Sequence, residues 1–405
     1  MASDSIADPR TRAQRALAKG DVAAALSICR DAFRHAGDAA QIASCPTVEP
    51  AAASSLASVE QLLVAEEPPI ESTAVLIDGL MQYPHWNQRY TPPAIRLFRL
   101  RNCTVHYPNV VVTAEGAILD DNAGFRTSAL CHHAIHGFPG LLSGSGHVLL
   151  RTPGDPVERL REPAFFLNAS PNYASWLFAD LPRLVTRMQV SRARLILHGE
   201  PHAFHLDSLH ALGVASEDIV RIPAQTRIEC AELFYCTSTF MDHAPSARGF
   251  AYLRERLARP GADAARCTGA HRVYLSRVGE QASRPLLNEQ ELIAFFRRRG
   301  FDIVAPETLE FREQVVRMLG ADSIAGPYGA NLANGIFPVQ ASNALIIATK
   351  EQPEFSRMFS ALAVPHAHAC AEPVKLKDAA TFSESFGFRV ALDDVGRCLD
   401  ALGVS

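Results

Sequence analysis

The spacing of apolar residues divides the chain into three regions. Apolar residues recur at helical spacing near the N-terminus, and an Ala-, Ser- and Pro-rich stretch at residues 36–58 predicts a linker. From residue 66 onward, short apolar runs alternate with amphipathic segments, which is typical of buried parallel strands connected by helices. We therefore expect a helical extension with its linker (residues 1–60), an acceptor-side α/β domain (66–245) and a donor-side α/β domain (246–405).

The N-terminal region predicts a pair of helices separated by a Lys-Gly-Asp turn at residues 19–21. The second helix carries one apolar stripe, formed by Val22, Leu26, Cys29 and Phe33. A single helical pair of this kind cannot bury its own apolar face. We therefore expect an accessory unit that covers the main body of the protein or binds a partner protein.

Short apolar runs indicate the strands of both α/β domains. In the first domain they lie at residues 109–121 (two strands joined at Glu115 and Gly116), 164–168, 194–199 and 219–223. In the second they lie at residues 272–277, 301–306, 323–326 and 344–349, with amphipathic helices at 288–300 and 311–320. A polar stretch at residues 241–268 predicts the junction between the domains. The alternation predicts two doubly wound domains that face a cleft.

Composition narrows the classes of function. The chain has 405 residues, of which 48% are hydrophobic, so it can bury the cores of two or three domains. Its formal net charge is −4 and it has no long basic tract, which argues against a nucleic-acid partner. No apolar run approaches the roughly 18 residues of a membrane span, and the N-terminus lacks the apolar core of a secretory signal. Nine cysteines without a CxxC pair argue against a disulfide framework, so we expect a cytoplasmic protein.

The stretch ADSIAGPYGANLANGIFP, residues 321–338, has the form of a strand, a turn of small residues and a helix. Gly326 and Gly329 let a ligand approach the backbone closely, and a helix that begins at Ala330 offers free N–H groups to an anion. The pattern predicts either a phosphate-binding turn or a turn whose glycines serve only tight packing.

A second segment, VYLSR followed by ASRPLLNEQE, places two arginines next to a helix start. Arg277 comes directly after a strand, where open α/β sheets bind ligands, and Arg284 follows in the loop. Two guanidinium groups suit a diphosphate because their N–H groups match phosphate oxygens. Asn288 and Glu291 have the spacing of a helix capping box, whereas Glu289 could cap the helix or contact a sugar hydroxyl.

A third segment, NYASWLFADLPRL at residues 172–184, combines an apolar face with one acidic residue, Asp180. Asp180 is either a functional carboxylate or a solvated charge at a helix end. Two histidine-rich stretches, at residues 131–136 and 198–205, lack the spacing of known zinc motifs, so we expect no metal site.

In this order, the three segments resemble glycosyltransferase family 61. The family patterns NxxHWLxxxLPRL, YxSR…R…NExE and GxHGAxLxN correspond here to residues 172–184, 274–291 and 326–334. Two family histidines are replaced, by Ser175 in the first pattern and by Tyr328 in the last. The family usually has an acidic residue four positions after the histidine of the first pattern. That position holds Ala179 here, and Asp180 is next to it.

The resemblance implies the GT-B fold, with two Rossmann-like domains facing a cleft. It also implies an inverting, metal-independent transfer of a sugar from a nucleotide sugar, with a uridine diphosphate leaving group expected, to a glycan or other hydroxyl acceptor in surface polysaccharide synthesis. No cofactor is expected apart from this donor. The donor-binding residues it implies are Arg277, Arg284, Asn288, Glu289, Gly326, Tyr328, Gly329, Ala330, Asn331 and Asn334, and the acceptor-side residues are Asn172, Ser175 and Trp176.

Such a transfer needs a base that takes the proton of the acceptor hydroxyl. Ser175 cannot serve, and the phenol of Tyr328 is a poor base at neutral pH but could hydrogen-bond a phosphate or the sugar. Asp180 is the first candidate, with His243 and Asp242 at the domain junction as alternatives. Two rival interpretations stay open. One is a non-catalytic module that binds a nucleotide sugar or glycan, and the other is a GT-B-like transferase of a non-sugar group.

Overall fold

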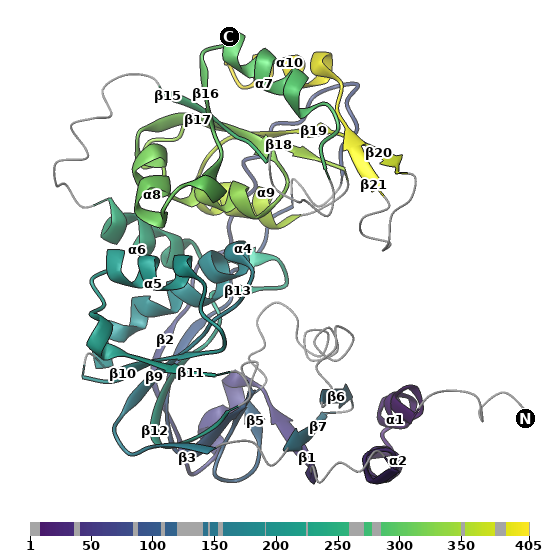
Figure 1. The fold of residues 1–405 in the computed structure, drawn as a ribbon, viewed down its shortest axis with the longest axis vertical. Coiled ribbons are helices and arrows are strands. Elements are labelled where there is room, and N and C mark those ends of the chain that lie inside the picture. The colour runs from purple at the N-terminus through teal and green to yellow at the C-terminus, as the bar shows by residue number, and fades with distance from the viewer. Residues whose placement is uncertain are drawn as a thin grey trace, which may run out of the picture.

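Two large sheets organise the described part of the chain, one in each half (Figure 1). The computed structural model describes residues 9–35, 41–83, 88–106, 110–119, 141–144, 146–152, 157–190, 192–223, 226–258, 271–277, 285–349, 353–376 and 386–404. In Figure 1 most of the N-terminal half lies below, in purple to teal, and the C-terminal half lies above, in green to yellow. The segment between β2 and β3 crosses to the upper part, where Ala74 bridges His366 of the C-terminal sheet. The fold is therefore mixed α/β, as the sequence predicts.

An all-parallel sheet of five described strands forms the C-terminal half. The strands are β15 (His271–Leu275), β16 (Phe301–Val304), β17 (Ala321–Pro327), β18 (Asn343–Ala348) and β19 (His366–Cys370). Their order across the sheet is β16-β15-β17-β18-β19. The chain leaves β15 toward one edge and returns to β17 on the other side of β15. The carboxyl ends of β15 and β17 therefore form a topological switch point, where open α/β sheets bind ligands.

Helices cover both faces of this sheet. They are α7 (Glu289–Arg298), η7 (Pro306–Thr308), α8 (Phe311–Leu319), η8 (Ala330–Ile336), α9 (Pro353–Ala361) and α10 (Leu392–Ala401), and a small hairpin is formed by β20 (Glu372–Lys375) and β21 (Phe386–Arg389). Successive side chains of a strand point to opposite faces. Tyr274 accordingly packs in the core under α7 and α10, whereas Val273 and Leu275 pack on the side of α8, α9 and η8. Figure 1 shows α8 and α9 on the side of the sheet that faces the N-terminal half.

A mixed sheet of twelve described strands forms the N-terminal half, in the order β11-β10-β9-β12-β3-β4-β5-β1-β7-β6, with β2 paired to β3 and β8 to β12. The strands are β1 (Gln41–Val48), β2 (Val59–Ala65), β3 (Ile95–His106), β4 (Val110–Val112), β5 (Ile118–Leu119), β6 (Leu141–Gly144), β7 (His147–Thr152), β8 (Val157–Leu160), β9 (Ala164–Asn168), β10 (Arg194–His198), β11 (Ile219–Ile222) and β12 (Arg227–Cys236). The neighbouring strands β11-β10-β9-β12 are parallel and form a Rossmann-like unit, and β8 also pairs in parallel with β12. The antiparallel extension that starts at β3 differs from the doubly wound sheet that the sequence predicts.

The N-terminal helices α1 (Pro9–Ala18) and α2 (Val22–His35) pack on this antiparallel extension. Ala13, Leu17, Ala25 and Cys29 form a small core with Leu149 of β7. The side chain of Phe33 lies outside the described residues. The interpretation of residues 36–58 as a linker is wrong for Gln41–Val48, because this segment is strand β1, antiparallel to β7 and parallel to β5. A short helix, η1 (Pro50–Ser55), follows it.

The predicted helix after β9 is helical but irregular. It consists of α4 (Tyr173–Ser175), a π-helical turn η3 (Trp176–Asp180) and a 3₁₀ segment η4 (Leu181–Val190). Pro182 explains the break, because proline has no N–H to donate to the carbonyl four residues earlier. That carbonyl, of Phe178, accepts a hydrogen bond of 2.7 Å from Thr239 Oγ1 instead. The tertiary contact therefore satisfies a group that the helix itself leaves unpaired.

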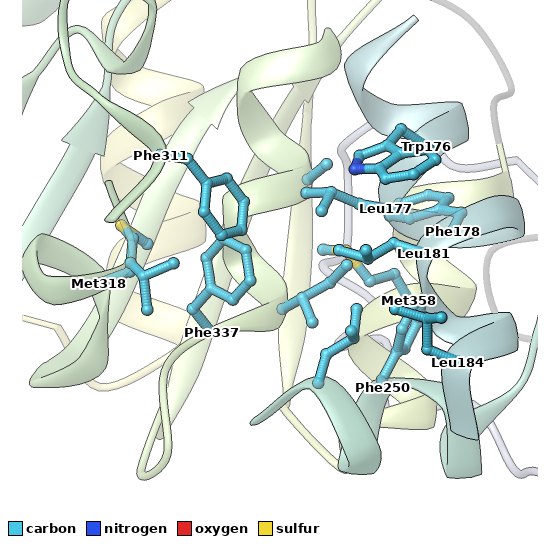
Figure 2. Close-up of a cluster of buried hydrophobic side chains, with 14 of the residues drawn as sticks. Trp176, Leu177, Phe178, Leu181, Leu184, Phe250, Phe311, Met318, Phe337 and Met358 are labelled. Carbon is cyan, nitrogen blue, oxygen red and sulfur yellow. The ribbon is translucent and has the colours of Figure 1, made fainter. Parts of the chain in front are cut away.

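The two halves share one hydrophobic core (Figure 2). Phe178 of the N-terminal half packs against Phe355 of α9, with ring centroids 5.6 Å apart. Phe250 belongs to α6 (Ala247–Leu257), the helix of the predicted junction, and its ring centroid lies 5.5 Å from that of Phe178. The remaining short elements are α5 (Ala203–Ala211), η5 (Ser216–Asp218), β13 (Phe240–Met241) and β14 (Ala244–Pro245). No helix in the described ranges is both long enough and apolar enough to cross a membrane.

Candidate functional site

The switch point of the C-terminal sheet brings together two of the segments singled out in the sequence. Strand β15 ends at Leu275 and continues into Ser276 and Arg277, and strand β17 ends at Pro327 and continues into Tyr328. Because β15 and β17 are parallel neighbours, the two turns lie side by side. Gly326 is needed in β17 for this pairing, since a Cβ there would lie 3.1 Å from the Leu275 carbonyl oxygen.

Arg277 spans the space between the two turns. Its Nη1 donates a hydrogen bond of 3.0 Å to the carbonyl oxygen of Tyr328. Its guanidinium lies against Gly329, where an added Cβ would be only 2.6 Å from Nη1. The backbone of Gly329 is extended, with φ 160°, so the glycine serves this close approach and not an unusual backbone conformation. Two of the donor-binding candidates from the sequence, Arg277 and Gly329, are therefore in direct contact.

Glu289 fastens the turn that carries Arg277. Its Oε1 accepts hydrogen bonds from the backbone N–H of Arg277 (2.7 Å), from Ser276 Oγ (3.1 Å) and from the Tyr274 hydroxyl (3.4 Å). Burial raises the pKa of this carboxyl, and the hydrogen bond from the Arg277 N–H opposes that increase. Glu289 therefore holds the shape of the turn through its first oxygen.

The predicted capping box at the start of α7 is wrong. Asn288 uses its side chain to hold Val390, donating to the Val390 carbonyl at 2.9 Å and accepting from its N–H at 3.3 Å. Glu291 lies at the surface, 3.7 Å from Arg389. Asn288 is buried, so its amide joins α7 to the end of β21 and does not reach the switch point.

The segment after Gly329 is a seven-residue 3₁₀ helix, η8, that begins at Ala330. Asn331 is buried and donates to the Ser276 carbonyl (3.2 Å) and to Glu307 Oε2 (2.8 Å). Asn334 is fully buried and donates to the Asn331 carbonyl at 3.0 Å, while its Oδ1 lies 2.9 Å from the Tyr173 hydroxyl. Both asparagines therefore stabilise the segment after Gly329 through buried hydrogen bonds.

Tyr328, which occupies the position of a family histidine, points toward α9. Its hydroxyl donates to Glu354 Oε1. Glu354 also faces His243, whose Nδ1 lies 3.4 Å from Oε2. Burial raises the pKa of Glu354, but the contacts with His243 and Tyr328 outweigh burial and the net pKa is lowered. A carboxylate that the sequence reasoning missed thus connects Tyr328 with a candidate base.

The other acceptor-side and catalytic candidates have different surroundings. Asn172 caps α4 by accepting from the Ser175 N–H at 3.0 Å, so both residues lie at the start of the helix that packs against η8. Trp176 is fully buried, and its Nε1 donates to Ser208 Oγ at 2.9 Å, so its ring has no surface to offer an acceptor. Asp180 is 3% exposed and lies 3.8 Å from the buried Arg183.

Some of the sequence candidates lie outside the described residues. These are Arg284 and the histidine-rich stretch at residues 131–136. In the other histidine-rich stretch, His205 is buried, accepts from the His202 N–H on Nδ1 and donates from Nε2 to the Ser170 carbonyl. Burial lowers its pKa to about 4, so it is a neutral structural residue. Across the described ranges, no group of His, Cys, Asp and Glu side chains is arranged to hold a metal ion.

Open α/β sheets bind ligands at such a switch point, and here an arginine lies there. The Glycosyltransferase 61 family matches residues 83–347, which is more than half of the chain. The chain therefore belongs to this family, which indicates glycosyltransferase activity and implies a sugar donor and an acceptor. A search of the curated proteins found no match.

Proposed function

We propose that this chain transfers a sugar from a nucleotide-sugar donor to a hydroxyl acceptor, with the donor diphosphate bound at the switch point of the C-terminal sheet. The contact between Arg277 and Gly329 carries the proposal. A glycine that makes room for a guanidinium, at the ends of two parallel strands, suits an anion that must approach the backbone closely.

Arg277 would stabilise the charge that develops on the leaving diphosphate. Its guanidinium is positively charged at all relevant pH values and its N–H groups match phosphate oxygens. Two hydrogen bonds keep Arg277 in place before the donor binds, from its backbone N–H to Glu289 and from its Nη1 to the Tyr328 carbonyl oxygen. Such preorganisation is what electrostatic catalysis requires. We propose that no metal is needed, with Arg284 as a second cation.

We further propose the two-domain GT-B arrangement, inversion at the anomeric carbon, a uridine nucleotide and a glycan acceptor of a surface polysaccharide pathway in the cytoplasm. The Rossmann-like order of β11-β10-β9-β12 and the parallel C-terminal sheet support two nucleotide-binding-like units. The remaining features rest on family membership.

The alternative is a module that binds a nucleotide sugar or glycan without turnover. The observation that favours it is the replacement of both family histidines, by Ser175 and Tyr328. Binding of the diphosphate is common to both proposals, so only turnover separates them.

The test measures uridine diphosphate binding by calorimetry, and nucleoside diphosphate release from a panel of nucleotide sugars, each with and without a chelator. We expect Arg277→Ala to weaken binding by about 10- to 150-fold, since a hydrogen bond to a charged group contributes about 1.5 to 3 kcal/mol. Arg298→Ala is the matched control, because Arg298 is an exposed arginine in the last turn of α7. Equal affinities for the two variants and the wild type would refute the donor site.

A further inference from the structure

We propose that His243 is the general base that takes the proton of the acceptor hydroxyl, and that Glu354 is the residue that positions it. The inference rests on the proposed function and adds to it the group that the replaced family histidines leave unaccounted for. It stands on three observations: a strained turn, a partly buried carboxylate facing the imidazole, and a side chain that connects this pair with the donor site.

The strained turn presents His243. Strands β13 and β14 pair Met241 with Ala244, so Asp242 and His243 form a two-residue hairpin turn. Their φ angles are 51° and 60°. Hairpin turns with two positive φ angles favour Asn-Gly, because other side chains are disfavoured in the left-handed region. A histidine in the glycine position is conformationally unfavourable, and such strain is concentrated at functional sites.

Hydrogen bonds from the surrounding structure hold this turn in place. Arg357 Nη1 donates a hydrogen bond of 2.7 Å to the carbonyl oxygen of Asp242. The hydroxyl of Tyr90 lies 3.1 Å from the carbonyl oxygen of Arg357 and 3.3 Å from that of Pro245, at the other end of the hairpin. The turn is thus clamped from α9, which also supplies Glu354 three residues before Arg357.

The His243 side chain is more exposed to solvent than the Glu354 side chain that it faces. The imidazole is 54% exposed, whereas the Glu354 carboxyl is 15% exposed. Oε2 of Glu354 is buried and, within the part of the chain that the structure describes, accepts no aligned hydrogen bond; His243 Nδ1 is 3.4 Å from it. A carboxylate that faces Nδ1 favours the proton on Nδ1 and leaves Nε2 as the acceptor.

Tyr328 connects the pair with the donor site. Its carbonyl oxygen accepts from Arg277, and its hydroxyl donates to the second oxygen of Glu354. The proposed base is therefore separated from the proposed diphosphate site by one tyrosine and one carboxylate. The replacement of the family histidine by a tyrosine has a role in this arrangement, because the phenol holds Glu354 while leaving its charge for His243.

In the proposed transfer, one bond to the anomeric carbon forms as another breaks. The acceptor oxygen forms a bond to the anomeric carbon while the bond from that carbon to the diphosphate oxygen breaks and the diphosphate leaves with the electron pair. The hydroxyl proton moves to Nε2 of His243, and the resulting imidazolium faces Glu354. The proton is then released to water, and the diphosphate carries its charge against Arg277.

The other candidates fit this step less well. Asp180 is buried beside Arg183, so it cannot contact an acceptor. Asp242 lies in the same turn, but the Glu354 carboxylate that would stabilise a protonated base faces His243. Among the described residues, the charged and titratable groups that face the His243–Glu354 pair are Arg357 on α9, Asp242 in the turn and Tyr328 after β17. Their charges contribute to the pH dependence of the pair.

The test compares His243→Gly and Glu354→Gln with His271→Gln. His271 is the matched control, since its Nδ1 also lies 3.4 Å from a carboxylate, that of Asp302, at the amino end of β15. The assay is release of uridine diphosphate from the donor that the wild type uses, with water as acceptor where no other is known. His243→Gly suits the hairpin turn better than histidine, so we expect a variant no less stable than the wild type.

We expect His243→Gly to lose at least 100-fold in turnover, to keep uridine diphosphate affinity within about twofold and to regain activity with added imidazole. Glu354→Gln should displace the acidic limb of the pH–rate profile, and His271→Gln should match the wild type. Retained turnover in His243→Gly, a parallel loss of nucleotide affinity, or no rescue by imidazole would overturn the assignment. A wild type that neither binds uridine diphosphate nor releases it from a donor would instead refute the proposed function.

Discussion

The contact between Arg277 and Gly329 yields the sharpest prediction, Gly329→Ala. The added methyl group would lie 2.6 Å from Nη1, 2.8 Å from Cζ and 3.1 Å from Nε of Arg277. An ordinary contact begins at 3.4 Å, so the guanidinium reaches one only by moving back 3.4 − 2.6 = 0.8 Å. The backbone of Gly329 is extended and accepts alanine, and the atoms in the way belong to the end of a flexible side chain. The fold should therefore survive while the arginine is displaced.

The displacement breaks the 3.0 Å bond from Nη1 to the Tyr328 carbonyl and moves the guanidinium away from the proposed diphosphate. A hydrogen bond to a charged group contributes about 1.5 to 3 kcal/mol, so uridine diphosphate affinity should fall by about 10- to 150-fold. Calorimetry measures the affinity, and thermal unfolding should show a melting temperature close to that of the wild type.

A double-mutant cycle separates this mechanism from a general disturbance of the loop. In an Arg277→Ala background the methyl group of Gly329→Ala meets no guanidinium, so the second substitution should change affinity little. Gly335→Ala is a useful contrast, because its Cβ would lie 2.9 Å from the buried ring of Phe359 and should lower stability. Additive losses for Gly329→Ala and Arg277→Ala, or full affinity in Gly329→Ala alone, would refute the reasoning.

Three further predictions concern Glu354, the N-terminal region and metal dependence. The pKa of Glu354 is lowered in the folded state, so this carboxylate contributes stability above pH 4.5 that is lost as pH falls through its folded pKa. Tyr328→Phe should therefore lower the free energy of unfolding by about 1.5 to 3 kcal/mol at pH 7. The difference from the wild type should shrink in acid, which chemical denaturation at several pH values measures. Deleting residues 1–35 should lower the melting temperature by exposing Leu149 but keep nucleotide affinity, whereas deletion to residue 60 removes strand β1 and should abolish folding; nucleotide affinity lost in a folded short deletion would contradict this. Uridine diphosphate binding should be unchanged by a chelator, and a strict requirement for Mg²⁺ or Mn²⁺ in calorimetry would contradict the metal-free proposal.

Several strands could be predicted because their apolar runs are buried on both faces. Strand β9 spans Ala164–Asn168, the predicted range, and all five residues are buried. The long strands β3 and β12 were missed because charged residues interrupt them. Arg101 of β3 lies opposite Glu232 of β12, and such half-exposed pairs give no continuous apolar run. Strand β1 was missed because Pro46 and small residues are typical of linkers.

Part of the candidate site could likewise be predicted from the sequence, and part could not. The turn at Arg277 was predictable because the motif and the strand end lie in one stretch of sequence. The pairing of His243 with Glu354 was not, because these residues are 354 − 243 = 111 positions apart and meet only in the tertiary structure. The burial of Asp180 had a local signal, since Arg183 lies three residues later on the same helical face and can partner a buried carboxylate.

The core that the two halves share has a consequence for engineering and for the evolution of specificity. Phe178, Phe250 and Phe355 pack together across the boundary between the halves, so neither half keeps its apolar surface covered when it is separated from the other. Grafting the C-terminal half of a relative onto this N-terminal half would leave mismatched aromatic side chains in the middle of the molecule. A change of donor or acceptor is therefore most easily reached by substitutions in the turns at the strand ends, one loop at a time, and not by exchanging halves as ready-made modules.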